Sequence, residues 1–165
     1  MKTTNKVILL LGGNIGNTQK FLFQAIRLLS IKLGTPTKQS HLYESEPWGF
    51  DASQNFINQV VEFQTEVKPL TLLDFTQKTE LELGRQKKAG TLYESRPIDI
   101  DILFIDDLCF ESERLTIPHK LLHERMFTLC PLSDYWGDFI HPKLNKSIHQ
   151  LITDCTDQSV VRRVD

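Results

Sequence analysis

The sequence predicts a single α+β domain in which helices pack on one face of a mostly antiparallel sheet, followed by a C-terminal helical extension. Short apolar or alternating runs, typical of strands, are separated by two longer segments with helical spacing. Their order is strand–helix–strand–strand–helix–strand, which is the ferredoxin-like βαββαβ order. No repeat, low-complexity tract or linker interrupts the 165 residues, so one domain over 1–165 is expected.

Both long helices of this order have marked ends. The first is indicated by apolar residues at helical spacing from Leu22 to Leu33, and Gly34 ends it. Pro69 opens the second helix at a first-turn position, and Gly84 closes it. The expected elements are, in order, a strand at 7–11, a helix at 22–33, strands at 39–43 and 56–63, a helix at 69–84, a strand through Asp99 and Asp101, and short helices from Pro118 and over 147–152.

Composition and charge argue against several classes of protein. The chain is 40% hydrophobic and 24% charged, which is ordinary for a globular protein, and its net charge of −2 gives no basic field for a nucleic acid. Three widely spaced cysteines without a Cys-x-x-Cys pair support neither a disulfide framework nor a zinc site. The apolar run 7–11 is too short for a signal peptide or a membrane span. We therefore expect a cytoplasmic monomer with no nucleic-acid or membrane partner.

The most informative stretch of the chain is Arg96-Pro97-Ile98-Asp99-Ile100-Asp101-Ile102. Its alternation places Asp99 and Asp101 on one face of a strand, with Cα atoms about 6.5–7 Å apart. Like charges this close raise each other's pKa unless a cation lies between them. Mg²⁺ takes carboxylate oxygens together with substrate phosphates, and the guanidinium fork of Arg96 suits an oxyanion. The stretch therefore predicts a metal–phosphate site.

The alternative explanation is structural: Asp99 and Asp101 lie on the solvent-exposed face of a strand and have no role in binding or catalysis. A short Asp-x-Asp motif often occurs without function. The apolar run 102–105 that follows instead indicates a central strand buried on both faces. Buried charges need partners, so two carboxylates without a ligand or a counter-charge are not expected on such a strand. The functional explanation is therefore favoured.

The helix that begins at Pro69 carries polar residues on its predicted apolar stripe. At about 100° per residue, Gln77 and Glu80 share a face with Leu70, Leu73 and Leu81. Either this face is open to water, or the two polar side chains face a ligand.

Three further features have a structural and a functional explanation. The cations Arg85, Lys87, Lys88 and Arg96 around the polar segment 86–95 form either a solvated surface or a phosphate-binding lid. His119 near a predicted helix start, with Arg125 beyond it, is either structural or part of an anion site. Phe56 and Phe127 are either core residues or two sides of an aromatic clamp on a flat ring.

The glycine-rich turn at 12–17 follows a predicted strand. It matches neither G-x-G-x-x-G nor the P-loop pattern, so it is weak support for a phosphate loop. A tight strand–helix connection is the better explanation.

Together these segments resemble the 6-hydroxymethyl-7,8-dihydropterin pyrophosphokinase family of folate biosynthesis, from the first strand to about Leu132. The resemblance depends on Leu11-Gly12-Gly13-Asn14, Tyr43-Glu44-Ser45-Glu46-Pro47-Trp48-Gly49, Phe56-Ile57-Asn58, Gln77-x-x-Glu80-x-x-x-Gly84-Arg85, Arg96-x-Ile98-Asp99-Ile100-Asp101-Ile102, and Arg114-Leu115-Thr116-Ile117-Pro118-His119 with Arg125 and Phe127. Each motif is weak alone, but their order and spacing together are specific.

The resemblance implies transfer of the β,γ-diphosphate of ATP to the pterin hydroxymethyl oxygen, with release of AMP. It implies that Asp99 and Asp101 hold two Mg²⁺ ions that neutralise developing charge and align an in-line displacement. With Arg85 and Arg96 they form the expected catalytic set. The implied nucleotide-binding residues are Gln77, Glu80, Lys87, Arg96, Ile102, Arg114, Thr116, His119 and Arg125, with Arg85 and Lys87 closing on the phosphates. The implied pterin-binding residues are Ser45, Pro47, Trp48, Phe56, Asn58 and Phe127, with the two phenylalanines sandwiching the ring.

Some positions depart from the family pattern. Gly13 stands where the family usually has Ser, and Lys87 where an Arg is often found, which gives charge without the bidentate fork. The aromatic residue usual in the 86–95 loop aligns loosely with Tyr93.

Two other functions fit parts of the sequence. A nucleotidyltransferase or two-metal phosphatase would use the same Asp-x-Asp, but polymerase-β-like transferases carry a Gly-Ser turn close upstream, and Gly12-Gly13 lies more than eighty residues away. A ferredoxin-like RNA-binding module needs exposed aromatic and basic residues on its strands. The aspartates and the net charge of −2 oppose that function.

Overall fold

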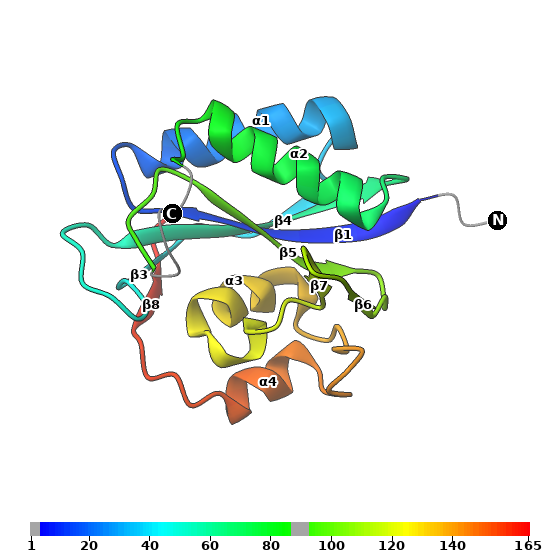
Figure 1. The fold of residues 1–165 in the computed structure, drawn as a ribbon. Helices are drawn as coiled ribbons and strands as arrows, with labels where there is room; N and C mark the ends of the chain where they lie inside the picture. Colours follow the sequence, from blue (N-terminus) through cyan, green and yellow to red (C-terminus); the bar gives the residue numbers. More distant parts are fainter. Residues whose placement is uncertain (1–3, 87–92) are drawn as a thin grey trace.

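A six-stranded antiparallel sheet forms the centre of the computed structural model, which describes residues 4–86 and 93–165 (Figure 1). The strands lie in the order β5-β1-β4-β3-β8, and β2 pairs with β4. Their bounds are β1 Asn5–Gly13, β2 Lys38–Gln39, β3 Tyr43–Ser45, β4 Phe56–Thr65, β5 Asp99–Ile105 and β8 Val161–Arg163. A separate pair is formed by β6 (Phe110–Glu111) and β7 (Thr116–Ile117).

Helices cover both faces of the sheet, not one face as the sequence predicted. The helices α1 (Thr18–Leu33) and α2 (Pro69–Glu82) lie on one face, and α3 (Met126–Trp136) and α4 (Ile148–Asp154) lie on the other (Figure 1). A short 3₁₀ turn, η1 (Leu122–Glu124), precedes α3. The predicted C-terminal helical extension is thus the second layer. No helix in the described part of the chain is long and apolar enough to cross a membrane.

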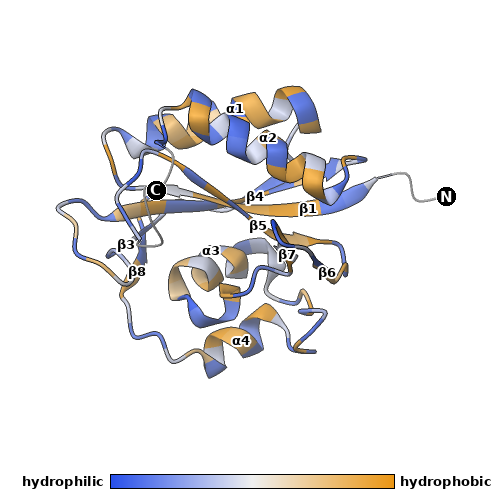
Figure 2. Cartoon of the chain, viewed as in Figure 1, coloured by the Kyte–Doolittle hydropathy of each residue, from blue (hydrophilic) through white to orange (hydrophobic). Residues whose placement is uncertain are grey.

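The reason for two layers lies in β1, which is apolar from Val7 to Leu11, the orange part of this strand in Figure 2. Val7, Leu9 and Leu11 join the core beneath α1 and α2, whereas Ile8 and Leu10 join the core beneath α3 and α4. All five side chains are at most 4% exposed. Because burying each one contributes about 1.5–3 kcal/mol, both faces of this strand need a cover.

The first turns of α1, α2 and α4 each contain a residue that suits a helix start. Asn17 caps α1 by accepting a hydrogen bond from the Lys20 N–H, and Pro69 occupies the first turn of α2. Ser147 and Gln150 form a capping box at the start of α4. The predicted helices over 22–33, 69–84 and 147–152 are confirmed.

The predicted strand at 39–43 is wrong as a single element. It is two short strands, β2 and β3, separated by Ser40-His41-Leu42. The Ser40 N–H donates to the Val60 carbonyl, and the Ser40 hydroxyl oxygen accepts from the Val60 N–H, both at 2.9 Å. A side chain therefore replaces a backbone acceptor at this point and interrupts the ladder.

The predicted helix from Pro118 is also wrong. After β7 the chain turns back onto the sheet, where the His119 N–H donates to the Leu103 carbonyl at 3.0 Å. The helix begins only at Met126. His119 is consequently not at a helix start.

The apolar stripe predicted for α2 is displaced around the helix. Leu70 and Leu81 are exposed, whereas Leu72, Thr76 and Thr79 are buried against the core. The threonine hydroxyls donate to the carbonyls of Leu73 and Phe75, both at 2.9 Å, so they need no partner outside the helix. Hydrophobicity alone does not reveal a buried face made of threonines.

Candidate active site

An open cleft of about 610 Å³ lies where the start of β5, the end of β3 and the start of α3 come together. Of the residues expected at the site, it is lined by Ser45, Trp48, Phe56, Asn58, Arg85, Arg96, Asp99, Asp101, Ile102, Arg114, Thr116, His119, Arg125 and Phe127. Pro47, Gln77 and Glu80 do not line it. Lys87, with Lys88 and most of the predicted lid, lies outside the described residues.

The carboxylates of Asp99 and Asp101 lie on β5 as the alternation predicts. Ile100 and Ile102 point into the core beneath α1 and α2, and Asp101 pairs in register with Leu10, on the opposite face. The strand is not central, however, as the sequence suggested. It is the end strand of the sheet, and the chain near His119 covers its outer edge. An apolar run cannot distinguish a central strand from an edge strand that is covered by a loop.

Gly12 and Gly13 end β1 at the point where other residues approach its backbone closely. A Cβ on Gly12 would lie 2.1 Å from Asn58 Oδ1, and one on Gly13 would lie 2.3 Å from the Pro97 carbonyl oxygen. Asn14 then accepts from the Arg96 N–H at 2.9 Å. The predicted tight strand–helix connection is confirmed, because β1 ends at Gly13 and α1 begins at Thr18. The bond from Arg96 to Asn14 within it fixes the start of the Asp-x-Asp strand.

Arginines surround Asp99. The Arg85 Nη1 donates to Asp99 Oδ1 and, at 2.6 Å, to Glu80 Oε1. The Arg96 Nη1 lies 3.5 Å from the other carboxylate oxygen of Asp99. Burial raises the pKa of Asp101, and the charge of Asp99 raises it further. A cation at this place would stabilise the charged pair.

Glu80 does not line the cleft, but it contacts two residues that do, Arg85 and Ile100. Its carboxylate is buried and accepts from the Ile100 N–H at 2.6 Å as well as from Arg85. Burial and the nearby Asp99 raise the pKa of Glu80. Gln77 is exposed, and its Oε1 accepts a hydrogen bond from Arg114 Nη2 at 3.4 Å. The sequence identified both polar residues as unusual, but their partners come from other elements and could not be read from the helix.

His119 is neutral at pH 7 and faces Asp101. Burial and then the charge of Arg125 lower the pKa of His119 to about 4. Its Nδ1 accepts from the Leu121 N–H at 3.2 Å, so the ring hydrogen is on Nε2, which lies 3.9 Å from Asp101 Oδ1. The histidine therefore presents a neutral donor to the cleft.

Aromatic side chains line the end of the cleft near β3. The guanidinium carbon of Arg125 lies 4.7 Å from the ring centre of Trp48 and 5.5 Å from that of Phe127. Phe56 packs edge-to-face on Phe50. Nearby, the buried Asn58 amide donates to the Ser45 hydroxyl at 3.3 Å. Flat faces beside a polar edge suit a planar ring that carries hydrogen-bonding groups.

Sequence reasoning missed several lining residues. Phe50 follows Trp48-Gly49 in the segment Glu46-Pro47-Trp48-Gly49-Phe50, whose aromatic residues are the signal that could have found it. The segment around Arg114 contributes more side chains than expected because β6 and β7 fold it over the cleft. The additional lining residues there are Ser112, Glu113, Leu115 and Lys120.

The donor set of the cleft fits a magnesium ion better than a metal held by protein ligands alone. Within residues 4–86 and 93–165, no group of three or more His, Cys, Asp or Glu side chains could hold a metal. Two carboxylates on one face of β5 remain, which is the protein contribution typical of Mg²⁺ bound together with substrate phosphates.

Residues 8–136 match the family model described as 7,8-dihydro-6-hydroxymethylpterin-pyrophosphokinase (HPPK). This chain belongs to that family. Proteins named 2-amino-4-hydroxy-6-hydroxymethyldihydropteridine pyrophosphokinase are among its HPPK relatives. The one from Porphyromonas gingivalis is 41% identical over 139 residues, 83% of this chain and 94% of the relative. The one from Bacillus subtilis is 38% identical over 131 residues, 79% of this chain and 77% of the relative.

Solved structures share the fold. The crystal structure of Plasmodium falciparum HPPK-DHPS has a TM-score of 0.69 and 21% identity, and the match covers 93% of this chain. This chain spans 42% of the length of that protein. At this identity the likeness concerns the fold alone.

Proposed function

We propose that this HPPK-family chain transfers diphosphate from ATP to 6-hydroxymethyl-7,8-dihydropterin, giving the pterin diphosphate and AMP in folate biosynthesis. Membership of the family supports this function, as do relatives named for the activity. The observation that carries it is the position of Asp99 and Asp101 in a cleft with arginines around them and aromatic side chains at one end.

The carboxylates of Asp99 and Asp101 would hold Mg²⁺, two ions by family resemblance. Bound there, the metal supplies charge neutralisation and alignment for an in-line displacement at phosphorus. Arg85 already restrains Asp99 in the free protein, so the carboxylate is oriented before any ligand arrives.

The arginines of the cleft would bind the phosphates. Arg85 and Arg96 reach Asp99 from different segments, and a guanidinium can bind a phosphate through two parallel hydrogen bonds. The Nε atoms of Arg96 and Arg125 are buried and have no hydrogen-bond partner among the described residues. Buried donors of this kind favour an acceptor, and phosphate oxygens would provide it.

The two ends of the cleft would separate the substrates. Towards β7, Ile102, Arg114, Thr116 and His119 would contact the nucleotide. Gln77 and Glu80 would act beside them through Arg114 and Arg85, and Lys87 remains a proposed phosphate ligand. Towards β3, Ser45 and Asn58 would meet the polar edge of the pterin, Phe56 and Phe127 its faces, and Pro47 and Trp48 its rim.

The proposed core architecture is ferredoxin-like. The strand order β5-β1-β4-β3, with α1 and α2 as the two crossing helices, supports it.

The test of the function is a nucleotide-resolved product assay. Purified protein is incubated with ATP, Mg²⁺ and 6-hydroxymethyl-7,8-dihydropterin, and the nucleotides are separated by chromatography. AMP should form only when all three are present. ADP as the product, or AMP without the pterin, would overturn the proposal.

A further inference from the structure

The C-terminal tail, residues 155–165, returns from α4 to the start of α3 and to β3. Figure 1 shows this segment running from the end of α4 to β8, which lies beside β3. It lies beyond residues 8–136, the part of the chain that matches the family model. The tail contacts two elements that form the aromatic end of the cleft, namely α3 and β3.

The first contact of the tail is at the start of α3. Asp157 Oδ2 accepts from the Met126 N–H, the first residue of this helix, at 2.9 Å. Arg125, at the N-cap position, makes no side-chain cap, so Asp157 supplies a cap from a distant segment. The residues on either side of Met126 are Arg125 and Phe127, and both line the cleft.

The tail holds Asp157 in place by local hydrogen bonds. Its Oδ1 accepts from the backbone N–H of Ser159 at 2.9 Å and from the Ser159 hydroxyl. These bonds, with that from Met126, lower the pKa of Asp157 against the opposing effect of burial. The carboxylate is therefore charged and oriented when it meets the positive end of the α3 dipole.

The second contact is a strand pairing with β3. Val161, Arg162 and Arg163 pair with Ser45, Glu44 and Tyr43, so the ladder ends at a cleft residue. The Arg162 guanidinium donates two hydrogen bonds to Glu44 Oε1, at 2.6 and 3.0 Å. Ser45 leads directly into the loop that carries Trp48.

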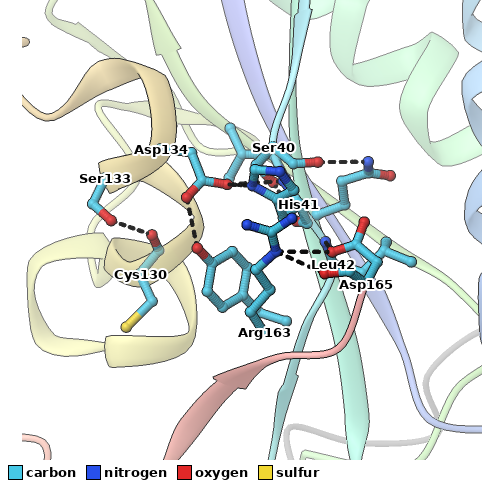
Figure 3. A network of polar contacts seen from close by, with 11 residues as sticks. Ser40, His41, Leu42, Cys130, Ser133, Asp134, Arg163 and Asp165 are labelled. Carbon is cyan, nitrogen blue, oxygen red and sulfur yellow. Dashed lines mark hydrogen bonds and ion pairs between the residues drawn. The ribbon is translucent and has the colours of Figure 1, made fainter.

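The far end of the pairing is closed by the last residues of the chain. The Val164 N–H donates to the Leu42 carbonyl, and Asp165 Oδ1 accepts from the Leu42 N–H, both at 2.9 Å (Figure 3). The side chain of Asp134, on α3, accepts from the His41 N–H at 2.8 Å and from the Tyr43 hydroxyl at 2.6 Å. Thus α3 and β3 meet directly at Asp134, and the tail joins their cleft-facing ends.

We propose that the C-terminal tail is a strap that positions the pterin-binding end of the cleft, with Asp157 and Arg162 as its positioning residues. The strap holds Phe127 through the start of α3, and Ser45 and Trp48 through β3. We expect a smaller effect at the nucleotide end, because Arg114 hydrogen-bonds to Asp74 and Thr116 pairs with β6, away from the strap. The inference rests on the proposed function, since it names the substrate that this end would bind.

The test compares substrate affinities in full-length variants. Asp157→Ala removes the cap, Asp157→Asn keeps an acceptor, and Arg162→Gln removes the double hydrogen bond to Glu44. Lys146→Gln is the matched control, because its exposed partner Asp154 belongs to the same C-terminal region but does not touch the cleft. Binding of the pterin in the presence of a non-hydrolysable ATP analogue is measured by calorimetry, beside the KM values for both substrates.

Asp157→Ala and Arg162→Gln should weaken pterin binding by about fivefold, the effect of losing one helix cap or one exposed ion pair. The KM for ATP should stay within about twofold, and Asp157→Asn and Lys146→Gln should resemble the wild type. Unchanged pterin affinity in both strap variants, or an equal loss of ATP affinity, would overturn the proposal. If Asp157→Ala does not fold, the pterin affinity of Arg162→Gln tests the proposal by itself, because the Arg162 side chain is exposed. Failure of the proposed function can be distinguished from failure of the strap proposal, because in that case the wild type itself would form no AMP.

Discussion

At the scale of single residues, Asp99 and Asp101 share a strand face but differ in their neighbours. Asp99 is held by Arg85 and Arg96, whereas among the described residues the basic side chain within 4 Å of Asp101 is His119, whose Nε2 lies beyond hydrogen-bond distance at 3.9 Å. Asp101 is therefore the carboxylate that has most to gain from a metal ion. The sequence predicts the pair and its face, but it does not predict this asymmetry, because Arg85 and His119 come from distant segments.

Replacing either carboxylate by its amide should abolish turnover. Asp99→Asn and Asp101→Asn remove a charge that would hold Mg²⁺, and we expect AMP formation to fall by at least about 10³-fold. Circular dichroism should show an unchanged fold, because both side chains face the cleft. Activity near that of the wild type in either variant would contradict the metal-binding role.

Gly12→Ala should weaken pterin binding without abolishing the fold. The new Cβ would lie 2.1 Å from Asn58 Oδ1, so the Asn58 amide must move away from Ser45. Losing that buried hydrogen bond should reduce pterin affinity by about tenfold. Titration with the pterin measures the effect. Gly34→Ala, which strains a backbone with a φ of +89° away from the cleft, is the comparison for a general backbone effect and should leave the pterin affinity unchanged. Equal affinities in the Gly12 variant and the wild type would show that Asn58 is not needed.

At the scale of elements, the strands and helices that form the two layers were predictable where apolar spacing and caps coincide, as in α1, α2 and β1. Prediction failed where partners far along the chain decide the conformation. Ser40 breaks a strand because of Val60, and His119 stays out of a helix because Leu103 binds its backbone. The strap strand β8 carries Val161-Arg162-Arg163, which has no apolar alternation, and its pairing with β3 could not be read from composition.

Truncating a buried side chain of β1, which contacts both cores, should lower the free energy of unfolding strongly. Leu9→Ala removes a fully buried side chain from β1, and we expect a loss of about 2–5 kcal/mol in the free energy of unfolding. Ile31→Ala, on the outer face of α1 and 75% exposed, should change it by no more than about 0.5 kcal/mol. Urea titration gives both values, and similar losses in the two variants would contradict the assigned core.

At the scale of the whole molecule, the charges gathered in the cleft are paired incompletely, so binding and stability are linked to pH. The raised pKa of Asp101 means that the folded chain retains a proton that the unfolded chain has lost. The lowered pKa of His119 has the opposite consequence. As the pH falls, the unfolded chain takes up a proton at this residue before the folded chain does, so the free energy of unfolding decreases. The stability of the metal-free protein therefore contains contributions of opposite sign, with Asp101 and Glu80, whose pKa values are raised, on one side and His119 on the other.

The contribution of Asp101 can be isolated by comparing the wild type with Asp101→Asn without metal. The free energy of unfolding of the wild type should fall relative to the variant as pH rises from the ordinary pKa of Asp, about 3.9, through the raised pKa. Thermal unfolding at a series of pH values measures this difference. A difference that is constant, or that grows in the other direction, would show that Asp101 is not destabilised by burial.

The position of β1 between two cores has a consequence for hydrogen exchange. This strand pairs with β4 on one side and β5 on the other, and each helical layer covers one of its faces. Neither layer can separate from the sheet and leave the backbone amides of residues 7–11 unprotected, so these amides exchange with solvent only when the whole molecule unfolds. Their protection factors should therefore report the global free energy of unfolding, while amides in the short strands β3 and β8 exchange through smaller openings at the edge of the sheet.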